Sequence, residues 1–424
     1  MSMIGRRKTA FFEMLDLLRA IEQDNENLKA VESLNLLILR EIIRSEKKIE
    51  EHRTIQKELN RILKTARLSK QDALIQRKKI KRRATYIDGY LRQTYIWKTF
   101  GDALAFIYLD KFAIKHAYYE TDEYKVKPDA GNITGKTGLI NEVALLLEVI
   151  KHNVPAVLCD ITNILRYGDV CLLGGSDPYL MEAKSRPTLN QRGKRQLAKL
   201  ETLHGFLEND RAPNFRGAPG ETTREKTSVP QKIYRDELNQ CIQEAVKHGT
   251  ATIEPEVGLR YSVIAHGKPN FAKLMPAGYK KPIAFMWNSD KNDFSWAPYE
   301  PFLLTIRDPK HLYDFIQGSI FIVIMVDAEV LVSAMAREGW EASFRENTEY
   351  SLQWRHLESG GIVGISNQFF ARIAYECVSP RWVVECHAEN VDRHMEHVKA
   401  MDHSKLVEFD EAKWRKMMLD TFGE

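Results

Sequence analysis

The first hundred residues contain no proline and few glycines, which leaves long helices as the natural conformation of this part of the chain. An imperfect seven-residue repeat runs through it, as in a helix that buries one seam against another helix. One position of the repeat holds Leu28, Asn35, Ile42, Ile49, Gln56 and Leu63, and the position three residues later holds Val31, Ile38, Ser45, His52, Leu59 and Ala66. The pattern predicts a helical arm over residues 1–100, with Asn35 as a polar residue that fixes the register.

Two arrangements of this arm fit the pattern. Ser69 is suited to cap a second helix, so the arm can fold back on itself as an antiparallel helical hairpin. The same seam can instead join separate chains in a coiled coil, which would make the protein a homo-oligomer or bind it to a partner protein.

Basic residues crowd the second half of the arm, with Asp72 as the only acid between them. Such a run can neutralise the phosphates of a nucleic acid. It can equally be a solvated helix face whose acidic partners lie on a neighbouring helix. The residues are Arg61, Lys64, Arg67, Lys70, Arg77, Lys78, Lys79, Lys81, Arg82 and Arg83.

Composition limits the class of protein. A chain of 424 residues with 44% hydrophobic content can form two or three domains with substantial cores. The five cysteines lack paired spacing, which favours buried reduced thiols and a cytoplasmic location. The apolar run at 319–326 is too short to span a bilayer, so we expect no membrane association. A formal net charge of +4 does not by itself indicate a nucleic-acid partner.

The segment around residue 170 carries the clearest sign of chemistry. Two short apolar runs, 170–173 and 179–181, flank a Gly-Gly-Ser-Asp-Pro turn and predict a β-hairpin. Side chains two apart on a strand share a face, so Glu182 and Lys184 emerge together, and the hairpin can bring Asp169 beside Glu182. Two converging carboxylates repel unless a cation joins them, and oxygen ligands suit Mg²⁺ or Mn²⁺. The Lys184 ammonium could then orient a water or stabilise charge on a phosphoryl oxygen.

With its flanking helices, this segment resembles the PD-(D/E)XK superfamily of phosphodiesterases, which includes many restriction enzymes, exonucleases and Holliday-junction resolvases. An apolar helix opens near Glu142 and runs to Ile150. A strand over 156–164, the hairpin and a helix over 191–207 follow it, in the family's order of helix, three strands and helix. The resemblance implies an α/β fold with a restriction-endonuclease-like core over 101–267.

The resemblance also implies the site residues. Asp169 and Glu182 would bind the metal, with the carbonyl of Ala183 as a further ligand, Lys184 would act on the water, and Glu142 would complete the acidic set. Glu148, near the end of the same helix, is expected to be solvated. A polar or basic residue on the following helix would assist, with four candidates: Gln191, Arg192, Arg195 and Gln196.

The sequence departs from the family name at Gly168, where the name implies proline. An alternative interpretation of the site is structural: Asp169 caps a strand, and Glu182 and Lys184 form a solvated charge pair. Asp160 and His266 could border the site, although structural roles are expected for both.

The rest of the chain has no motif of its own. The polar segment 209–231 predicts a loop, whose Arg211, Arg216, Arg224 and Lys226 could order on nucleic acid. A helix over 232–247 and a strand over 259–265 would complete the core. Residues 268–424 predict an α/β or α+β module, with strands at 320–326, 361–365 and 382–386 and helices at 328–338 and 367–377.

These features predict a nuclease that depends on Mg²⁺ or Mn²⁺ and hydrolyses phosphodiester bonds, of DNA rather than RNA. The accessory parts resemble those of bacterial restriction or phage-defence effectors, which is an analogy of organisation only. The alternative is a catalytically inactive protein that binds nucleic acid or acts as a scaffold assembled through its arm.

Overall fold

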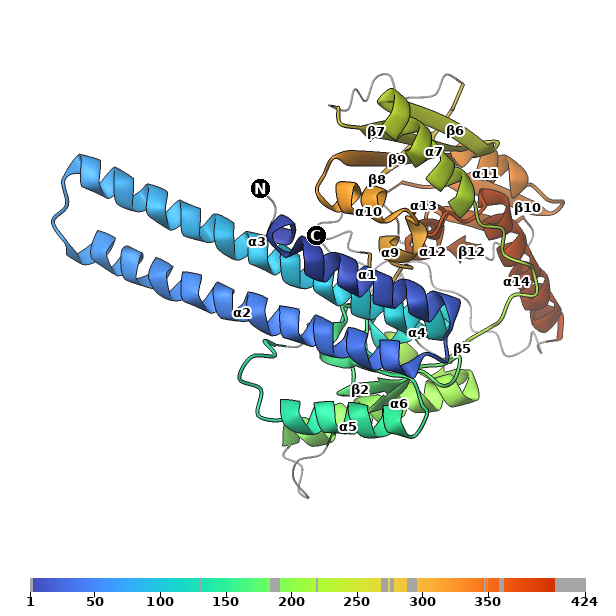
Figure 1. Ribbon diagram of the computed structural model, residues 1–424. Helices are drawn as coiled ribbons and strands as arrows, with labels where there is room; N and C mark the ends of the chain where they lie inside the picture. The colour runs from blue at the N-terminus through green and yellow to red at the C-terminus, as the bar shows by residue number, and fades with distance from the viewer. Residues whose placement is uncertain are drawn as a thin grey trace.

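The computed structural model describes residues 3–129, 131–183, 191–218, 220–267, 274, 278–287, 296–346, 348, 350–357 and 362–400. The chain is of the mixed α/β class: long N-terminal helices are followed by small antiparallel sheets with shorter helices around them (Figure 1). Within these ranges, no helix has both the length and the apolar character needed to cross a membrane.

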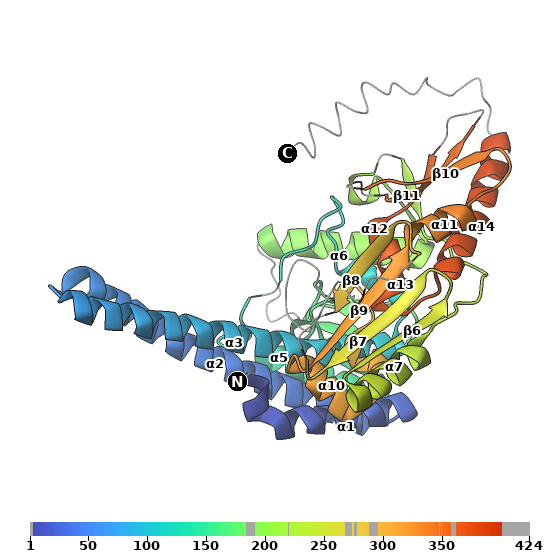
Figure 2. The same ribbon diagram turned by 90° about the horizontal axis from the view of Figure 1, so that it is seen from above.

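The N-terminal region is a helical hairpin, as one of the two predicted arrangements has it. After η1 (Met3–Arg7) and α1 (Lys8–Gln23), the helices α2 (Leu28–Thr65) and α3 (Lys70–Tyr108) run side by side in opposite directions and extend away from the rest of the molecule (Figures 1 and 2). The Ser69 side chain caps α3 by accepting a hydrogen bond of 3.1 Å from the amide of Asp72. The predicted cap is therefore confirmed.

The predicted seam is buried only near the body of the molecule. Val31, Ile38, Ile42 and Ile49 are buried, whereas the later seam positions from residue 52 onward are partly or fully exposed. Burial of the seam ends in the part of the hairpin that extends away from the rest of the molecule (Figure 1).

Asn35 has a different role from the predicted one. Its side-chain amide donates to the carbonyl of Ala156 at 3.1 Å and accepts from the amide of Leu158 at 3.1 Å. Both partners lie on β1 (Ala156–Leu158), the edge strand of a three-stranded sheet. A carboxamide offers one donor side and one acceptor, like a peptide group, so Asn35 satisfies the strand edge and fixes α2 to the sheet.

This first sheet has the predicted order of elements. Helix α5 (Leu139–Lys151) precedes β1, then β2 (Val170–Leu172) and β3 (Tyr179–Met181) form the hairpin, and α6 (Gln191–Asn209) follows. The strands pair antiparallel in the order β1-β2-β3.

The strand predicted over 156–164 is shorter than expected. It ends at Leu158 and leads into η3 (Cys159–Ile161). The carboxylate of Asp102, on α3, accepts hydrogen bonds from the amides of Asn163 at 2.6 Å and Ile164 at 3.1 Å. These amides therefore need no strand partner.

A second sheet joins residues from both sides of the predicted boundary at 267. It follows α7 (Arg235–His248) and consists of β6 (Thr250–Glu256), β7 (Leu259–Ala265), β8 (Pro282–Trp287) and β9 (Ile320–Asp327), in the antiparallel order β6-β7-β9-β8. The predicted buried strand at 320–326 is confirmed. The prediction that 259–265 completes the first core is wrong: β7 is largely buried, and β6 and β9 pair with its two edges.

The segment 209–231 is more ordered than predicted. It contains a hairpin of β4 (Arg211–Pro213) and β5 (Glu221–Thr223), with η4 (Phe215–Gly217) between them. Arg224 donates to Asp177, in the turn between β2 and β3, at 2.6 and 2.7 Å, and it also pairs with Asp210. Arg224 therefore stabilises the fold through its ion pairs with Asp177 and Asp210.

The C-terminal region contains a third sheet, of β10 (Trp340–Phe344), β11 (Leu352–His356) and β12 (Ile362–Ile365), in that order. Its helices are α9 (Phe302–Thr305), α10 (Pro309–Ile316), α11 (Ala328–Ala334), α12 (Asn367–Phe370), α13 (Arg372–Tyr375) and α14 (Pro380–Ala400).

The strand predicted over 382–386 is wrong, because these residues open α14. The Ser379 hydroxyl accepts a hydrogen bond from the amide of Trp382 at 3.2 Å, and Trp382, Val383 and Cys386 bury one side of the helix. All five cysteines are free and buried, as predicted.

Candidate active site

Three carboxylates meet around one lysine at the edge of the first sheet. Glu142 lies in the first turn of α5, Asp160 in η3, and Asp169 directly before β2. The Lys136 ammonium lies 2.8 Å from Glu142 Oε1, 2.8 Å from Asp160 Oδ2 and 3.3 Å from Asp169 Oδ1. We call Glu142, Asp160 and Asp169 the acidic cluster.

Lys136 is held in place by the arm. The buried carboxylate of Glu46, on α2, accepts hydrogen bonds from the amides of Ile133 at 3.0 Å and Thr134 at 2.7 Å. The Lys136 amide then donates to the carbonyl of Ile133 at 3.1 Å, which closes the turn before α5. Helix α2 thus fixes the loop that carries the lysine.

Asp169 is anchored through its backbone and its side chain. Its amide donates to the Met181 carbonyl at 2.7 Å, and its Oδ2 accepts from the Ala183 amide at 2.8 Å. Gly168 precedes it with a φ of +68°, and a Cβ there would lie 2.8 Å from the Met181 carbonyl oxygen. Proline has a fixed negative φ, so the residue that the family name implies cannot occupy this position.

The structure brings two of the four predicted catalytic residues together, Glu142 and Asp169. Glu182 follows Met181, whose ladder partner is Val170, so continuing the register by one residue sets Glu182 opposite Asp169. The Ala183 amide donates a hydrogen bond to Asp169, which fixes this backbone segment beside the acidic cluster. Lys184 lies outside the described residues.

Four of the candidates on the neighbouring helices have described side chains, and all four are exposed to solvent. Gln191, Arg195 and Gln196 are exposed on α6, and the side chain of Arg192 lies outside the described residues. Glu148 is 57% exposed and pairs with His152, as predicted for a solvated position.

The acidic cluster carries more negative than positive charge. Burial raises the pKa of Glu142, the charge of Asp169 raises it further, and the hydrogen bond from Lys136 opposes both. Burial lowers the pKa of Lys136, but hydrogen bonds to Asp160 and Glu142 outweigh this, so its pKa is raised. The ammonium therefore stays charged, and three carboxylates share it.

The donors fit a hard divalent cation, but the lysine holds the central position. Carboxylate oxygens are the ligands that Mg²⁺ and Mn²⁺ prefer. Within the described ranges, no group of three or more His, Cys, Asp and Glu side chains is arranged to hold a metal ion. A metal at this point would require the Lys136 ammonium to move aside.

The interpretation of the sequence missed two members of this site. The sequence pattern favours a structural role for Asp160 over a place at the border of the site, and it assigns no catalytic role to Lys136. The signal available for Lys136 was its place in a Gly-Lys-Thr-Gly turn directly before the helix of Glu142. His266 follows β7, which belongs to the second sheet, so the topology does not connect it to this site.

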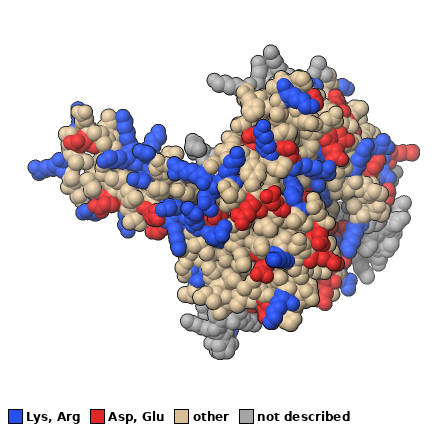
Figure 3. Space-filling model, viewed as in Figure 1, with Lys and Arg blue, Asp and Glu red and all other residues tan. Residues whose placement is uncertain are grey.

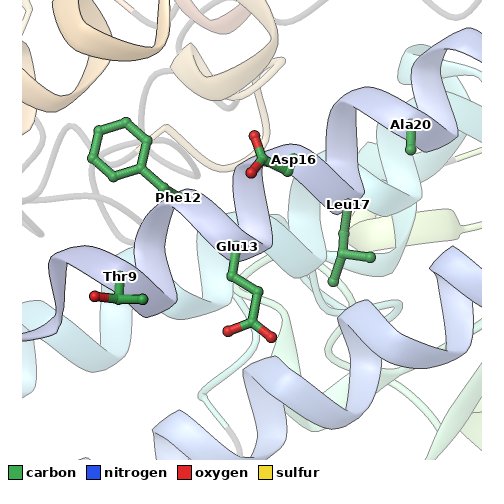
Figure 4. A pocket seen from close by; sticks show the side chains of 6 residues that line it. All are labelled: Thr9, Phe12, Glu13, Asp16, Leu17 and Ala20. Carbon is green, nitrogen blue, oxygen red and sulfur yellow. The ribbon is translucent and has the colours of Figure 1, made fainter.

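A separate hollow lies on α1. It is lined by Thr9, Phe12, Glu13, Asp16, Leu17 and Ala20 (Figure 4). Its side chains come from one helix and point in different directions, so they offer no convergent polar groups of the kind that bind substrates.

Comparison of the chain with protein-family models, with curated proteins and with solved structures finds no match. The chemistry of the site is therefore inferred from its own residues, which are three carboxylates around one cation at the edge of a small antiparallel sheet.

Proposed function

We propose that the protein is a metal-dependent nuclease of the PD-(D/E)XK type that hydrolyses phosphodiester bonds, with DNA as its expected substrate. One observation carries the proposal: the Glu142 and Asp169 carboxylates, which the sequence pattern assigns to the site from a helix and a hairpin, lie at the same ammonium. Asp160 adds a third acid to this point.

The proposed roles follow from the chemistry of each group. Asp169, Glu142 and Glu182 would hold Mg²⁺ or Mn²⁺, with the backbone of Ala183 beside them. The metal would supply charge for the phosphate oxygens and lower the pKa of a bound water. Lys184 would orient that water. Lys136 would keep the carboxylates together in the absence of metal.

The excess of basic residues on the arm supports the proposal that the partner is a nucleic acid. Residues 53–83 contain twelve Lys and Arg residues but only two acids, Glu58 and Asp72. Glu58 pairs with Arg61 at 2.7 Å and Asp72 accepts a hydrogen bond from Ser69, so neither neutralises the run as a whole. Lys and Arg side chains cover much of the arm in Figure 3. Exposed, unbalanced positive charge of this kind attracts a phosphate backbone. The basic residues are Arg53, Lys57, Arg61, Lys64, Arg67, Lys70, Arg77, Lys78, Lys79, Lys81, Arg82 and Arg83.

A role in restriction or phage defence rests on organisation alone. A catalytic core with a long helical arm and a further α/β module resembles such effectors, and the arm would select the target or assemble the protein.

The second candidate function is a non-catalytic protein that binds nucleic acid or serves as a scaffold. The position of Lys136 favours it, because an ammonium among three carboxylates is also what a purely structural ion cluster looks like.

A cleavage assay separates the two candidates. Plasmid, linear and single-stranded substrates would be incubated with the protein and Mg²⁺, Mn²⁺ or EDTA. The nuclease should cut only with metal, and Asp169→Asn, Glu142→Gln and Lys184→Ala should each reduce the rate by at least ~10²-fold.

The matched control is Glu148→Gln, which removes an exposed carboxylate from the same helix as Glu142 and should leave the rate unchanged. Metal-dependent cleavage that survives Asp169→Asn would assign the activity to another site. Absence of cleavage by the parent protein under all conditions would favour the scaffold.

A further inference from the structure

A second group of charged residues, positive where the acidic cluster is negative, includes the buried Arg372 of α13. The charges of Arg372 and of Arg216, in η4, both act on Lys115, in η2 (Lys115–Ala117), and Lys115 and Arg216 are partly buried. We call these three residues the cationic cluster. Within the described residues, the Lys115 ammonium forms no hydrogen bond or ion pair.

The cationic cluster contains donors that have no acceptor. Arg372 is 1% exposed, and its Nη2 has no hydrogen-bond partner, although its Nη1 bonds Glu376. Arg216 donates from Nη2 to His116 Nδ1 at 2.9 Å, but its buried Nε has no partner. Leaving a buried donor unsatisfied is costly, and the cost is higher for a charged group.

The nearby acidic residues, Glu376 and Asp110, already have partners within the fold. Glu376 is shared by two cations, Arg372 and Lys111, the latter at 2.9 Å. Asp110 caps the short helix α4 (Lys111–Ile114) by accepting from the amides of Phe112 and Ala113. Positive charge therefore exceeds negative charge here.

The excess of positive charge changes the pKa of Lys115. Burial, followed by the charges of Arg372 and Arg216, lowers the pKa of this lysine to about 7. Neighbouring cations repel one another, and a bound anion would relieve both this repulsion and the unmet donors.

Flat aromatic side chains adjoin the guanidinium groups. The rings of Tyr119 and Tyr124 stack with centroids 5.0 Å apart at 11°, and Arg216 lies over Tyr119 at 5.1 Å. Arg372 lies over Phe112 at 4.7 Å. Tyr124 is 45% exposed, so an aromatic surface lies in solvent beside the cationic cluster.

We propose that the cationic cluster binds the phosphate of a nucleoside phosphate, whose base stacks on Tyr124. A phosphate offers several acceptor oxygens, which suits two guanidinium groups with unmet donors and one ammonium, supplied by three different elements. The aromatic surface beside them selects a ligand with a base over a bare phosphate. Because Lys115 and Arg216 come from the middle of the chain and Arg372 from the C-terminal region, the ligand would bridge the two.

The test is calorimetric titration of the full chain with AMP, ribose 5-phosphate and inorganic phosphate. AMP should bind with a dissociation constant at least ~10-fold lower than that of the other two, since base stacking adds to the phosphate contacts. Tyr124→Ala should raise the dissociation constant of AMP to that of ribose 5-phosphate. Equal binding of AMP and phosphate by the parent protein would overturn the assignment of the base.

Lys115→Gln distinguishes a binding role from a structural one. It should weaken AMP binding at least ~10-fold and at the same time raise the melting temperature of the ligand-free protein, because it removes a repelled charge. Lys125→Gln is the control, since Lys125 is an exposed lysine of the neighbouring segment that pairs with Glu123. Asp169→Asn should bind AMP as the parent does.

Two outcomes would overturn the proposal. One is a parent protein that binds none of the three probes. The other is a Lys115→Gln variant that binds AMP as well as the parent.

Discussion

The acidic cluster and the cationic cluster are opposite in charge and alike in construction. In the first, Glu142, Asp160 and Asp169 share the single ammonium of Lys136. In the second, Lys115, Arg216 and Arg372 surround few available acids, and Glu376 is already shared. In each cluster, the charges of one sign outnumber the counter-charges that pair with them.

The two lysines make the difference measurable. Hydrogen bonds to carboxylates raise the pKa of Lys136 despite its burial, whereas burial and neighbouring cations lower that of Lys115 to about 7. The same side chain is therefore stabilised by its charge in one place and destabilised by it in the other. Replacing each lysine should change stability in opposite directions.

The largest effect is expected for Lys136→Met. The change leaves three carboxylates without a counter-ion, and we expect the free energy of unfolding in EDTA to fall by about 2–3 kcal/mol, discounted for partial exposure. Urea denaturation measures it. If the acidic cluster accepts a divalent cation, millimolar Mg²⁺ should restore part of the loss in the variant. An unchanged stability would show that the lysine does not hold the carboxylates together.

A smaller effect of opposite sign is expected for Lys115→Gln. The folded state holds Lys115 with a pKa of about 7, below the ordinary lysine value of 10.5. Between these two values the unfolded state binds more protons, so stability rises with pH. The variant should exceed the parent by at least about 1 kcal/mol at pH 6. Its advantage should shrink above pH 7 and vanish near pH 10.5. A gain that does not depend on pH would point to packing instead of charge.

The smallest effect on stability is expected on the arm, where charge is unbalanced but solvated. Replacing Lys64, Lys70 and Lys78 by alanine should change the free energy of unfolding by less than about 0.5 kcal/mol. The salt dependence of DNA affinity should weaken by roughly 0.9 in slope for each lysine that contacts a phosphate. Glu50→Gln, on the same arm, serves as the control variant. An unchanged slope would show that these lysines do not contact the phosphates of DNA.

Much of the local structure could be predicted because its signals lie within a few residues. Ser69 caps α3 through the amide of Asp72, three residues away. The Gly-Gly-Ser-Asp-Pro turn between β2 and β3 likewise predicts the hairpin from adjacent residues. Glu142 could be assigned to the site of Asp169 only through the resemblance to the PD-(D/E)XK superfamily, which implies an acidic residue on the helix before the hairpin.

The other members of the acidic cluster could not be found in this way. Lys136 lies 24 residues from Asp160 and 33 from Asp169, and Glu46 of α2 binds the loop that carries it. No local pattern encodes such a contact.

Local sequence determined the long helices, their caps, the hairpin at 170–181 and the reduced state of the cysteines, because each depends on side-chain periodicity, turn residues or spacing. Tertiary structure decided the rest. It set Asn35 against the edge of β1, paired β7 with β9 across the predicted boundary and placed Lys115 where the charges of Arg372 and Arg216 act on it. These outcomes depend on which surfaces pack against each other, and burial then sets the energy of every charge enclosed between them.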